Sequence, residues 1–223
     1  MGETVALPDV LARASVFGRV VVKPSRYSSG GSGVVIVRPD EDGFDLPAYA
    51  RRWGAWLVEE HVSQHPELDV LNPYVLNTLR VITLLREGAA EVLYVMLKLG
   101  GTRSTTDNSA AGGIQIRVHP DGRLDPHGYD RCLTAHTRHA VSSVPFAGHR
   151  ISRMAEVREL AGRCARLFPQ VPFIGWDIAL TPDGPVVIEG NSSPSLAHVQ
   201  RTHGGVAPEL VPALRAVMDR PLI

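Results

Sequence analysis

The sequence lacks a long hydrophobic run and an excess of charge of either sign. No apolar stretch approaches the roughly 18 to 20 residues of a membrane span, and the N-terminus MGETVALPDV lacks the basic-then-apolar order of a signal peptide. The 23 basic residues balance the 23 acidic ones, so no general electrostatic field draws the chain to nucleic acid or to an anionic membrane. We therefore expect a cytoplasmic protein that binds neither of them.

Cysteine is also scarce. Cys132 and Cys164 are isolated and show no CxxC spacing, so the sequence indicates neither a disulfide framework nor a zinc site, and we expect buried free thiols. The chain has no internal repeat. Its 223 residues, of which 44% are hydrophobic and 21% charged, suffice for one large domain or one and a half small ones with a real core.

Hydrophobic patterning predicts a series of strands with a few helices among them. The expected strands cover residues 17–24, 34–37, 55–62, 74–85, 91–99, 114–118, 173–180 and 186–189, and the expected helices cover 46–53, 153–168 and 207–218. Ser152 is the expected N-cap of the second helix, and the polar, histidine-rich stretch 125–151 is expected to be irregular. Such an order favours an α+β fold with antiparallel sheets over a doubly wound parallel sheet.

The stretch GWDIALTPDGPVVIEGN carries the strongest chemical signal. If PDG forms a three-residue loop, Thr181 pairs with Pro185 and Asp177 lies directly opposite Glu189. Asn191 is two residues further on, so it lies on the same face of an extended strand. Two carboxylates and an amide oxygen together are hard ligands of the kind that Mg²⁺ prefers. The alternative is a hairpin whose charges point to water, although the apolar flanks of both acids argue against it.

The order of several motifs resembles the ATP-grasp superfamily. These motifs are Lys23 before a glycine-rich loop, EEHV at the end of a strand, and D-(x11)-E-x-N on a terminal hairpin. More narrowly, NTLRVITLL, LKLGG, DNSAAGG and WDIALTPDGPVVIEGN are similar to the ATP-grasp group associated with sugar-transfer gene neighbourhoods, over residues 16–195. The resemblance implies two α+β subdomains with antiparallel sheets that sandwich the nucleotide. Residues 1–62 would form the small subdomain and 63–223 the large one.

The resemblance also assigns roles to single residues. Lys23 would touch the α-phosphate and the adenine, and Lys98 would face the phosphates. The residues implied for nucleotide binding are Lys23, Ser29, Gly30, Gly31, Ser32, Glu59, Glu60, Val62 and Lys98. Asp177, Glu189 and Asn191 would bind Mg²⁺. Arg80 and Asn108 would lie near the phosphates or near the acceptor, and the sequence does not decide which. We expect Asp177→Asn or Glu189→Gln to abolish ATP turnover and to leave the fold intact.

Each of these residues also has a purely structural interpretation. Lys23 could be an ordinary lysine at a strand end, and the glycine-serine loop that follows it could be a passive hairpin tip. Arg80 lies in an apolar run, so it is either paired or faces an anion. The histidines His136, His139 and His149 would suit a metal only on a helix, and their surroundings favour a loop instead.

The activity that the resemblance implies is an ATP-dependent carboxylate–amine ligase, which forms an amide or peptide bond through an acylphosphate and uses ATP and Mg²⁺. One alternative is a kinase that phosphorylates a hydroxyl group of a small molecule or peptide. Another is a non-catalytic nucleotide-binding subunit. Because ATP-grasp enzymes usually carry a further N-terminal domain, we expect that the chain is a fragment, or that a partner protein or a second copy supplies acceptor-binding surface.

Overall fold

A computed structural model describes residues 7–26, 31–38, 40, 43–101 and 112–218, with the backbone alone at positions 7 and 218. The chain divides into two compact units, Met1–Ser63 and Gln64–Ile223. The resemblance stated from the sequence predicts a subdomain boundary after residue 62. The roles of the two parts as nucleotide-binding subdomains stay predictions.

The first unit is a small three-stranded sheet with two helices. Its elements are α1 (Leu7–Phe17), β1 (Val20–Pro24), β2 (Val35–Val37), α2 (Leu46–Trp53) and β3 (Trp56–Glu60). The strand order is β2-β1-β3, with antiparallel neighbours. This confirms the expected hairpin and helix 46–53, whereas α1 was not expected. Asp45 caps α2 by accepting a hydrogen bond from the backbone N–H of Ala48 at 2.8 Å.

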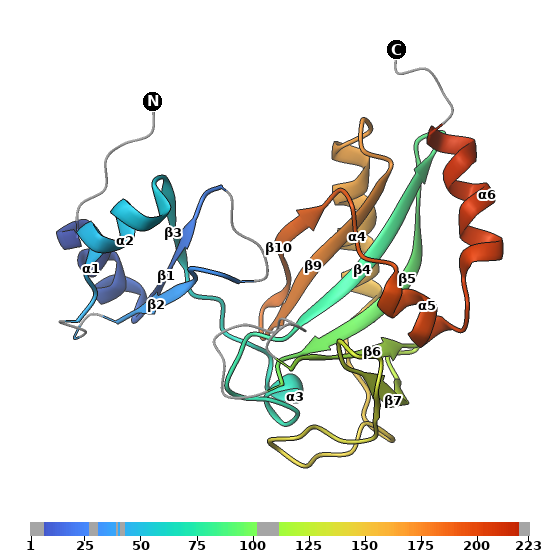
Figure 1. The fold of residues 1–223 in the computed structure, drawn as a ribbon, viewed down its shortest axis with the longest axis horizontal. Coiled ribbons are helices and arrows are strands. Elements are labelled where there is room, and N and C mark those ends of the chain that lie inside the picture. The colour runs from blue at the N-terminus through green and yellow to red at the C-terminus, as the bar shows by residue number, and fades with distance from the viewer. Residues whose placement is uncertain (1–6, 27–30, 39, 41–42, 102–111, 219–223) are drawn as a thin grey trace. The chain divides into compact units, whose positions relative to one another are not determined.

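The second unit is built on a seven-stranded antiparallel sheet with the order β10-β9-β4-β5-β6-β7-β8 (Figure 1). Its elements are α3 (Pro66–Asp69), β4 (Thr78–Arg86), β5 (Ala89–Leu99), β6 (Ile114–Val118), β7 (Leu124–Tyr129), β8 (Ala135–His136), α4 (Met154–Leu167), β9 (Phe173–Thr181), β10 (Gly184–Asn191), α5 (Ala197–His203) and α6 (Ala207–Met218). The antiparallel sheets confirm the predicted α+β class.

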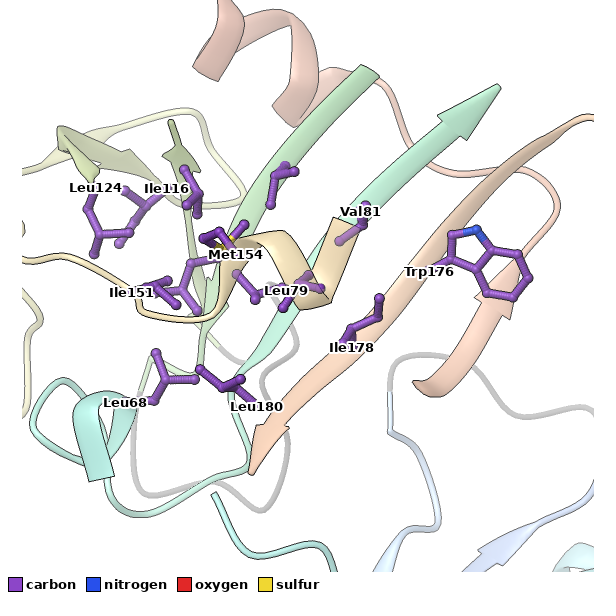
Figure 2. Packing of buried hydrophobic residues seen from close by; sticks show 14 of the residues in the cluster. Leu68, Leu79, Val81, Ile116, Leu124, Ile151, Met154, Trp176, Ile178 and Leu180 are labelled. Carbon is purple, nitrogen blue, oxygen red and sulfur yellow. The ribbon is translucent and has the colours of Figure 1, made fainter. Parts of the chain in front are cut away.

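The two faces of this sheet differ in what covers them. On one face, alternate residues such as Leu79 and Ile178 join the largest core cluster, together with Met154 and Val157 of α4 (Figure 2). The opposite face packs Ile82 and Met96 against Val199 of α5 and residues of α6. Because side chains alternate along a strand, Arg80, Lys98 and Asp177 point to this second face. Arg80, Lys98 and Asp177 therefore lie on the same face as the apolar side chains of this second cluster.

Several sequence-based expectations about the second unit are wrong. Ser152 does not cap α4, because the N-cap residue is Arg153 in a left-handed conformation with φ 57°. The backbone N–H of Ser152 instead donates to Oε1 of Glu67 at 2.9 Å. The strand β8 and all of β7 except Leu124 lie within the stretch expected to be irregular. The strand β7 was not predicted because Pro126 and Gly128 are residues that usually interrupt strands.

Two further properties concern the exposure of the cysteines and the length of the helices. Cys132 is exposed, contrary to the expectation of a buried thiol, whereas Cys164 is half-buried and burial raises the pKa of its thiol. Among the residues that the structure describes, no helix combines the length and the apolar character that crossing a membrane requires.

Candidate functional site

The β9–β10 hairpin brings the two predicted acidic ligands opposite each other by an unexpected route. Thr181 pairs with Gly184, so the turn has two residues and the predicted three-residue loop is wrong. The register then shifts by one residue between Val187 and Glu189, and Glu189 pairs with Asp177. A β-bulge at Ile188 therefore restores the alignment that a longer loop was expected to give.

Asp177 is the centre of a charged cluster on the inner strands. It lies on β9 next to Arg80 of β4, and its side chain is 3% exposed. The Arg80 guanidinium donates from Nε to Oδ1 and from Nη2 to Oδ2, the latter at 2.9 Å. Nζ of Lys98, on β5, also donates to Oδ2 at 2.9 Å. A bidentate pair between a guanidinium group and a carboxylate is among the stronger and more directional ionic contacts in proteins.

The protonation state of Asp177 reflects two opposing effects. Burial raises its pKa, since a charged carboxylate loses its hydration. The hydrogen bonds and charges of Arg80 and Lys98 outweigh burial and hold the pKa of Asp177 below its ordinary value. Asp177 is therefore ionised at neutral pH, beside a guanidinium and an ammonium group that face the same side of the sheet.

Glu189 and Asn191 lie on β10 beside this cluster. Nδ2 of Asn191 donates to Oε1 of Glu189 at 3.2 Å and to the carbonyl oxygen of Gly175 at 3.4 Å. Its side-chain oxygen makes no hydrogen bond to the described residues. Two carboxylates and one amide oxygen on adjacent strands suit Mg²⁺, which usually takes one or two carboxylates with phosphates and water completing the shell. Asp177 would have to loosen one cationic contact to take part, so the metal site stays a prediction.

A glycine allows a loop to pack closely against the cluster. A Cβ atom added to Gly175 would lie 2.7 Å from Cβ of Pro194 and 3.1 Å from Cδ of Arg80. Pro194 is buried and belongs to the loop between β10 and α5. Because Gly175 has no side chain, this loop and the aliphatic part of the Arg80 side chain can both pack against β9 at this position.

In the first unit, two predicted nucleotide-binding residues form an ion pair with each other. Nζ of Lys23 lies 2.7 Å from Oε2 of Glu59, because Glu59 pairs with Val21 and is diagonal to Lys23 across β1 and β3. Glu60 is exposed at the end of β3, and Val62, two residues later, is half-buried. Whether these residues bind a nucleotide stays a prediction.

The described part of the glycine-rich loop has constrained geometry. Gly31 and Gly33 have positive φ angles of 74° and 82°, a region that favours glycine. The Tyr49 hydroxyl donates to the carbonyl oxygen of Gly33 at 2.7 Å, while Gly31 and Ser32 are exposed. The predicted site residues Ser29, Gly30 and Asn108 lie outside the described residues.

A buried polar network surrounds Gly100, two residues after Lys98. The Gly100 carbonyl oxygen accepts hydrogen bonds from Nε2 of His139 at 2.6 Å and from Nδ2 of Asn72 at 2.9 Å. Its N–H donates to Oδ1 of Asn77 at 3.2 Å. Asn72, Asn77 and His139 are fully buried, so they fix the end of β5. This network was not predicted from the sequence, although two asparagines among apolar residues indicate buried polar contacts.

The three histidines singled out from the sequence bond to separate partners. His139 binds Gly100, Nε2 of His136 lies 2.9 Å from Oδ2 of Asp130, and Nε2 of His149 donates to the carbonyl oxygen of Glu67 at 3.0 Å. Within the described residues, no group of three or more histidine, cysteine, aspartate or glutamate side chains could hold a metal ion. These histidines have structural partners instead.

Comparisons with known proteins identify one matching family and several solved structures that are similar in fold. The model of the family described as "Sugar-transfer associated ATP-grasp" matches residues 43–215. Among curated proteins no match is found. A solved structure of the biotin carboxylase domain of Hydrogenobacter thermophilus 2-oxoglutarate carboxylase, in complex with MgADP and bicarbonate, is 14% identical with a TM-score of 0.56. The match covers 97% of this chain and 40% of that one, so the chain spans less than half of that domain.

Two ligases are also similar in structure. D-alanyl-alanine synthetase A from Vibrio cholerae is 13% identical, with a TM-score of 0.49 and coverage of 96% of this chain and 56% of that one. D-Alanine–D-alanine ligase from Bacillus anthracis is 14% identical, with a TM-score of 0.49 and coverage of 97% and 59%.

Proposed function

Because the chain belongs to the sugar-transfer associated ATP-grasp family, we propose that it is an ATP-dependent ligase that joins a carboxylate to an amine. The observation that carries this proposal is the arrangement around Asp177, where a buried carboxylate holds Arg80 and Lys98 and lies opposite Glu189. This arrangement suits the transfer of a phosphoryl group to a carboxylate, because the charges to be stabilised are all negative.

Arg80 and Lys98 have the central part in the proposed mechanism. Their donors are held on one face of the sheet by Asp177, so little reorganisation is needed when charge develops on the phosphoryl group. They stabilise this group as it moves from ATP to the substrate carboxylate. The resulting acylphosphate then reacts with the amine, and phosphate leaves.

The residues that would hold Mg²⁺ are Asp177, Glu189 and Asn191. When bound, the ion would neutralise phosphate charge and orient the transferring group. Asn191 supports this role in the donor set, because its hydrogen bond holds it next to Glu189 and leaves Oδ1 without a hydrogen bond to the described residues. Lys23 and Glu59 are the corresponding candidates in the first unit for contacts to the nucleotide.

The association of the family with sugar transfer suggests a carboxylate or amine drawn from sugar or amino-acid metabolism. A kinase reaction would use the same phosphoryl-binding groups but would end with a phosphorylated product. The products therefore separate these two activities.

A trapping assay tests the proposal directly. The protein is incubated with ATP, Mg²⁺, hydroxylamine and a mixture of D-alanine, L-glutamate and D-glucuronate. A ligase produces hydroxamate together with equimolar ADP and free phosphate, because hydroxylamine captures an acylphosphate. ADP with a phosphorylated product and no hydroxamate would favour the kinase, and nucleotide binding without ADP formation would favour a non-catalytic subunit.

A further inference from the structure

His198 is a buried histidine on the same face of the sheet as the charged cluster. It lies on α5, which packs against β5, β6 and β7, and it is 8% exposed. The neighbouring Val199 joins the core cluster with Ile82 and Met96. The charge of Arg80 is close enough to affect the pKa of His198. The proposed phosphoryl-transfer mechanism does not use this imidazole.

One hydrogen bond fixes the tautomer of the His198 ring. Nε2 lies 3.2 Å from the backbone carbonyl oxygen of Asp130. A carbonyl oxygen can only accept, so Nε2 carries the hydrogen and the neutral ring keeps its lone pair on Nδ1. Nδ1 makes no hydrogen bond within the described residues. His198 as a whole is 8% exposed, so the residue is not completely enclosed.

The surroundings keep the His198 ring neutral. Burial is the largest effect and lowers the pKa of His198, and the Arg80 charge lowers it further. The carbonyl and the carboxylate of Asp130 act in the opposite direction without reversing the shift. The carboxylate of Asp130 is itself paired with His136. At neutral pH the ring is therefore unprotonated at Nδ1 and able to accept a proton.

We propose that His198 is the general base that takes a proton from the ammonium form of the amine substrate, so that the neutral amine can attack the acylphosphate. This inference rests on the proposed ligase function and adds a residue to it. The amine nitrogen forms a bond to the acyl carbon, the bond from that carbon to the phosphate oxygen breaks, and phosphate leaves with the bonding electrons. Nδ1 of His198 takes the first proton, from the ammonium group, and later releases it to solvent, and the leaving phosphate takes the second proton, which the nitrogen loses as the amide forms.

The other histidine of α5 provides a contrast. Nδ1 of His203 is 2.8 Å from the hydroxyl of Thr202, and its ring packs edge-on against Tyr94. Burial, followed by the charge of Arg117, lowers the pKa of His203 to about 4. A base that weak accepts a proton poorly at neutral pH. His203 is therefore a matched control on the same helix.

The test compares two amine probes in the trapping reaction. Hydroxylamine is largely unprotonated at neutral pH and needs no base, whereas the amino groups of D-alanine and L-glutamate are protonated. We expect His198→Gln to form hydroxamate within about 2-fold of wild type and to form amide about 10² to 10⁴ times more slowly, the usual contribution of a general base. Wild-type amide formation should level off above the pKa of His198, whereas in this variant it should keep rising with pH as more of the amine becomes unprotonated, and His203→Gln should behave as wild type.

Four results would overturn the inference. Hydroxamate and amide could fall together in His198→Gln, which indicates a structural role, or neither could fall. Wild-type protein could form neither product, in which case the ligase proposal itself fails. Nitrogen-15 NMR of the histidine rings needs no substrate and separates the cases, because it should show His198 protonated on Nε2 alone at pH 7. A ring protonated on Nδ1 excludes the base even if the ligase proposal holds.

Discussion

Asp177 combines a structural role with the predicted functional one. Its carboxylate accepts hydrogen bonds from both Arg80 and Lys98 in a buried position, whereas Glu189 is exposed and contacts Asn191. The sequence alone predicts that substitution of either acid leaves the fold intact. The structure separates the two acids, because removing one partner of a buried ionic cluster leaves the other charges uncompensated.

Glu189→Gln is the cleaner test of the predicted metal site. We expect it to abolish Mg²⁺-dependent ATP turnover and to change the free energy of unfolding by less than about 0.5 kcal/mol, as for most exposed positions. Turnover assays with denaturant unfolding measure both quantities. Asp183→Asn, in the exposed turn of the same hairpin, is the control and should retain turnover. Equal activity of Glu189→Gln and wild type would remove Glu189 from the metal site.

Asp177→Asn should behave differently. We expect it to abolish turnover and also to destabilise the protein by about 3–5 kcal/mol, because Arg80 and Lys98 lose their shared carboxylate. Denaturant unfolding of the variant and of wild type measures this difference. A change below about 1 kcal/mol would show that the ionic cluster contributes little to stability.

The ionic cluster also predicts a pH dependence. The pKa of Asp177 is lowered in the folded protein from an ordinary value of 3.8, so its stabilising contribution is complete above that value. It is lost as the pH falls through the lower folded pKa. We expect the stability difference between wild type and Asp177→Asn to be constant from pH 5 to 7 and to shrink below about pH 4. A difference that grows in acid would contradict the assignment.

Residue types and spacing predicted part of this site. The acids and the asparagine of the hairpin stand out because polar residues interrupt apolar strands. The contacts of Asp177 with Arg80 and Lys98 could not be predicted from short stretches of sequence, because they join residues that are 97 and 79 positions apart. They depend on the pairing of β4 with both β5 and β9, which no local pattern specifies.

At the level of elements, the β9–β10 hairpin shows how a wrong turn prediction still gave a correct pairing. The two-residue turn shifts the register by one position, and the bulge at Ile188 shifts it back before Glu189. Bulges leave little trace in a sequence, because any residue can adopt them. The helix α5 was missed for a related reason, since its seven residues are too few for a clear amphipathic period.

The close packing around Gly175 gives a prediction for β9. We expect Gly175→Ala to destabilise the protein by about 1–3 kcal/mol, because the new methyl group meets Pro194 and the Arg80 side chain. Thermal or denaturant unfolding measures the effect. Gly43→Ala is the control, because a Cβ atom at Gly43 contacts nothing within 4 Å. Equal stability of the two variants would mean that the loop adjusts freely.

The network at the end of β5 can be tested through Asn77. Its side chain bonds to Gln64, to two backbone carbonyl oxygens and to the N–H of Gly100. We expect Asn77→Ala to cost about 1–3 kcal/mol, because buried polar groups are left without partners. Thr137→Ala removes an exposed hydroxyl and should be neutral in the same unfolding assay. A neutral Asn77→Ala would show that water replaces the lost bonds.

For the whole molecule, the sequence predicted the α+β class and the family, because motif order survives where single motifs are weak. Several short motifs in the right order led to the same family whose model matches residues 43–215. The substrates could not be predicted in this way. A fold shared at 14% identity with a biotin carboxylase domain supports many reactions, and specificity depends on a few side chains.

The central claim is that the protein activates a carboxylate as an acylphosphate. The most direct measurement uses D-alanine, L-glutamate and D-glucuronate labelled with oxygen-18 in their carboxylates, together with ATP, Mg²⁺ and hydroxylamine. Mass spectrometry of the released phosphate then follows the label. The account predicts that each phosphate carries one oxygen-18 atom, because the carboxylate oxygen stays with phosphorus when the acylphosphate breaks. Phosphate released without label would contradict it.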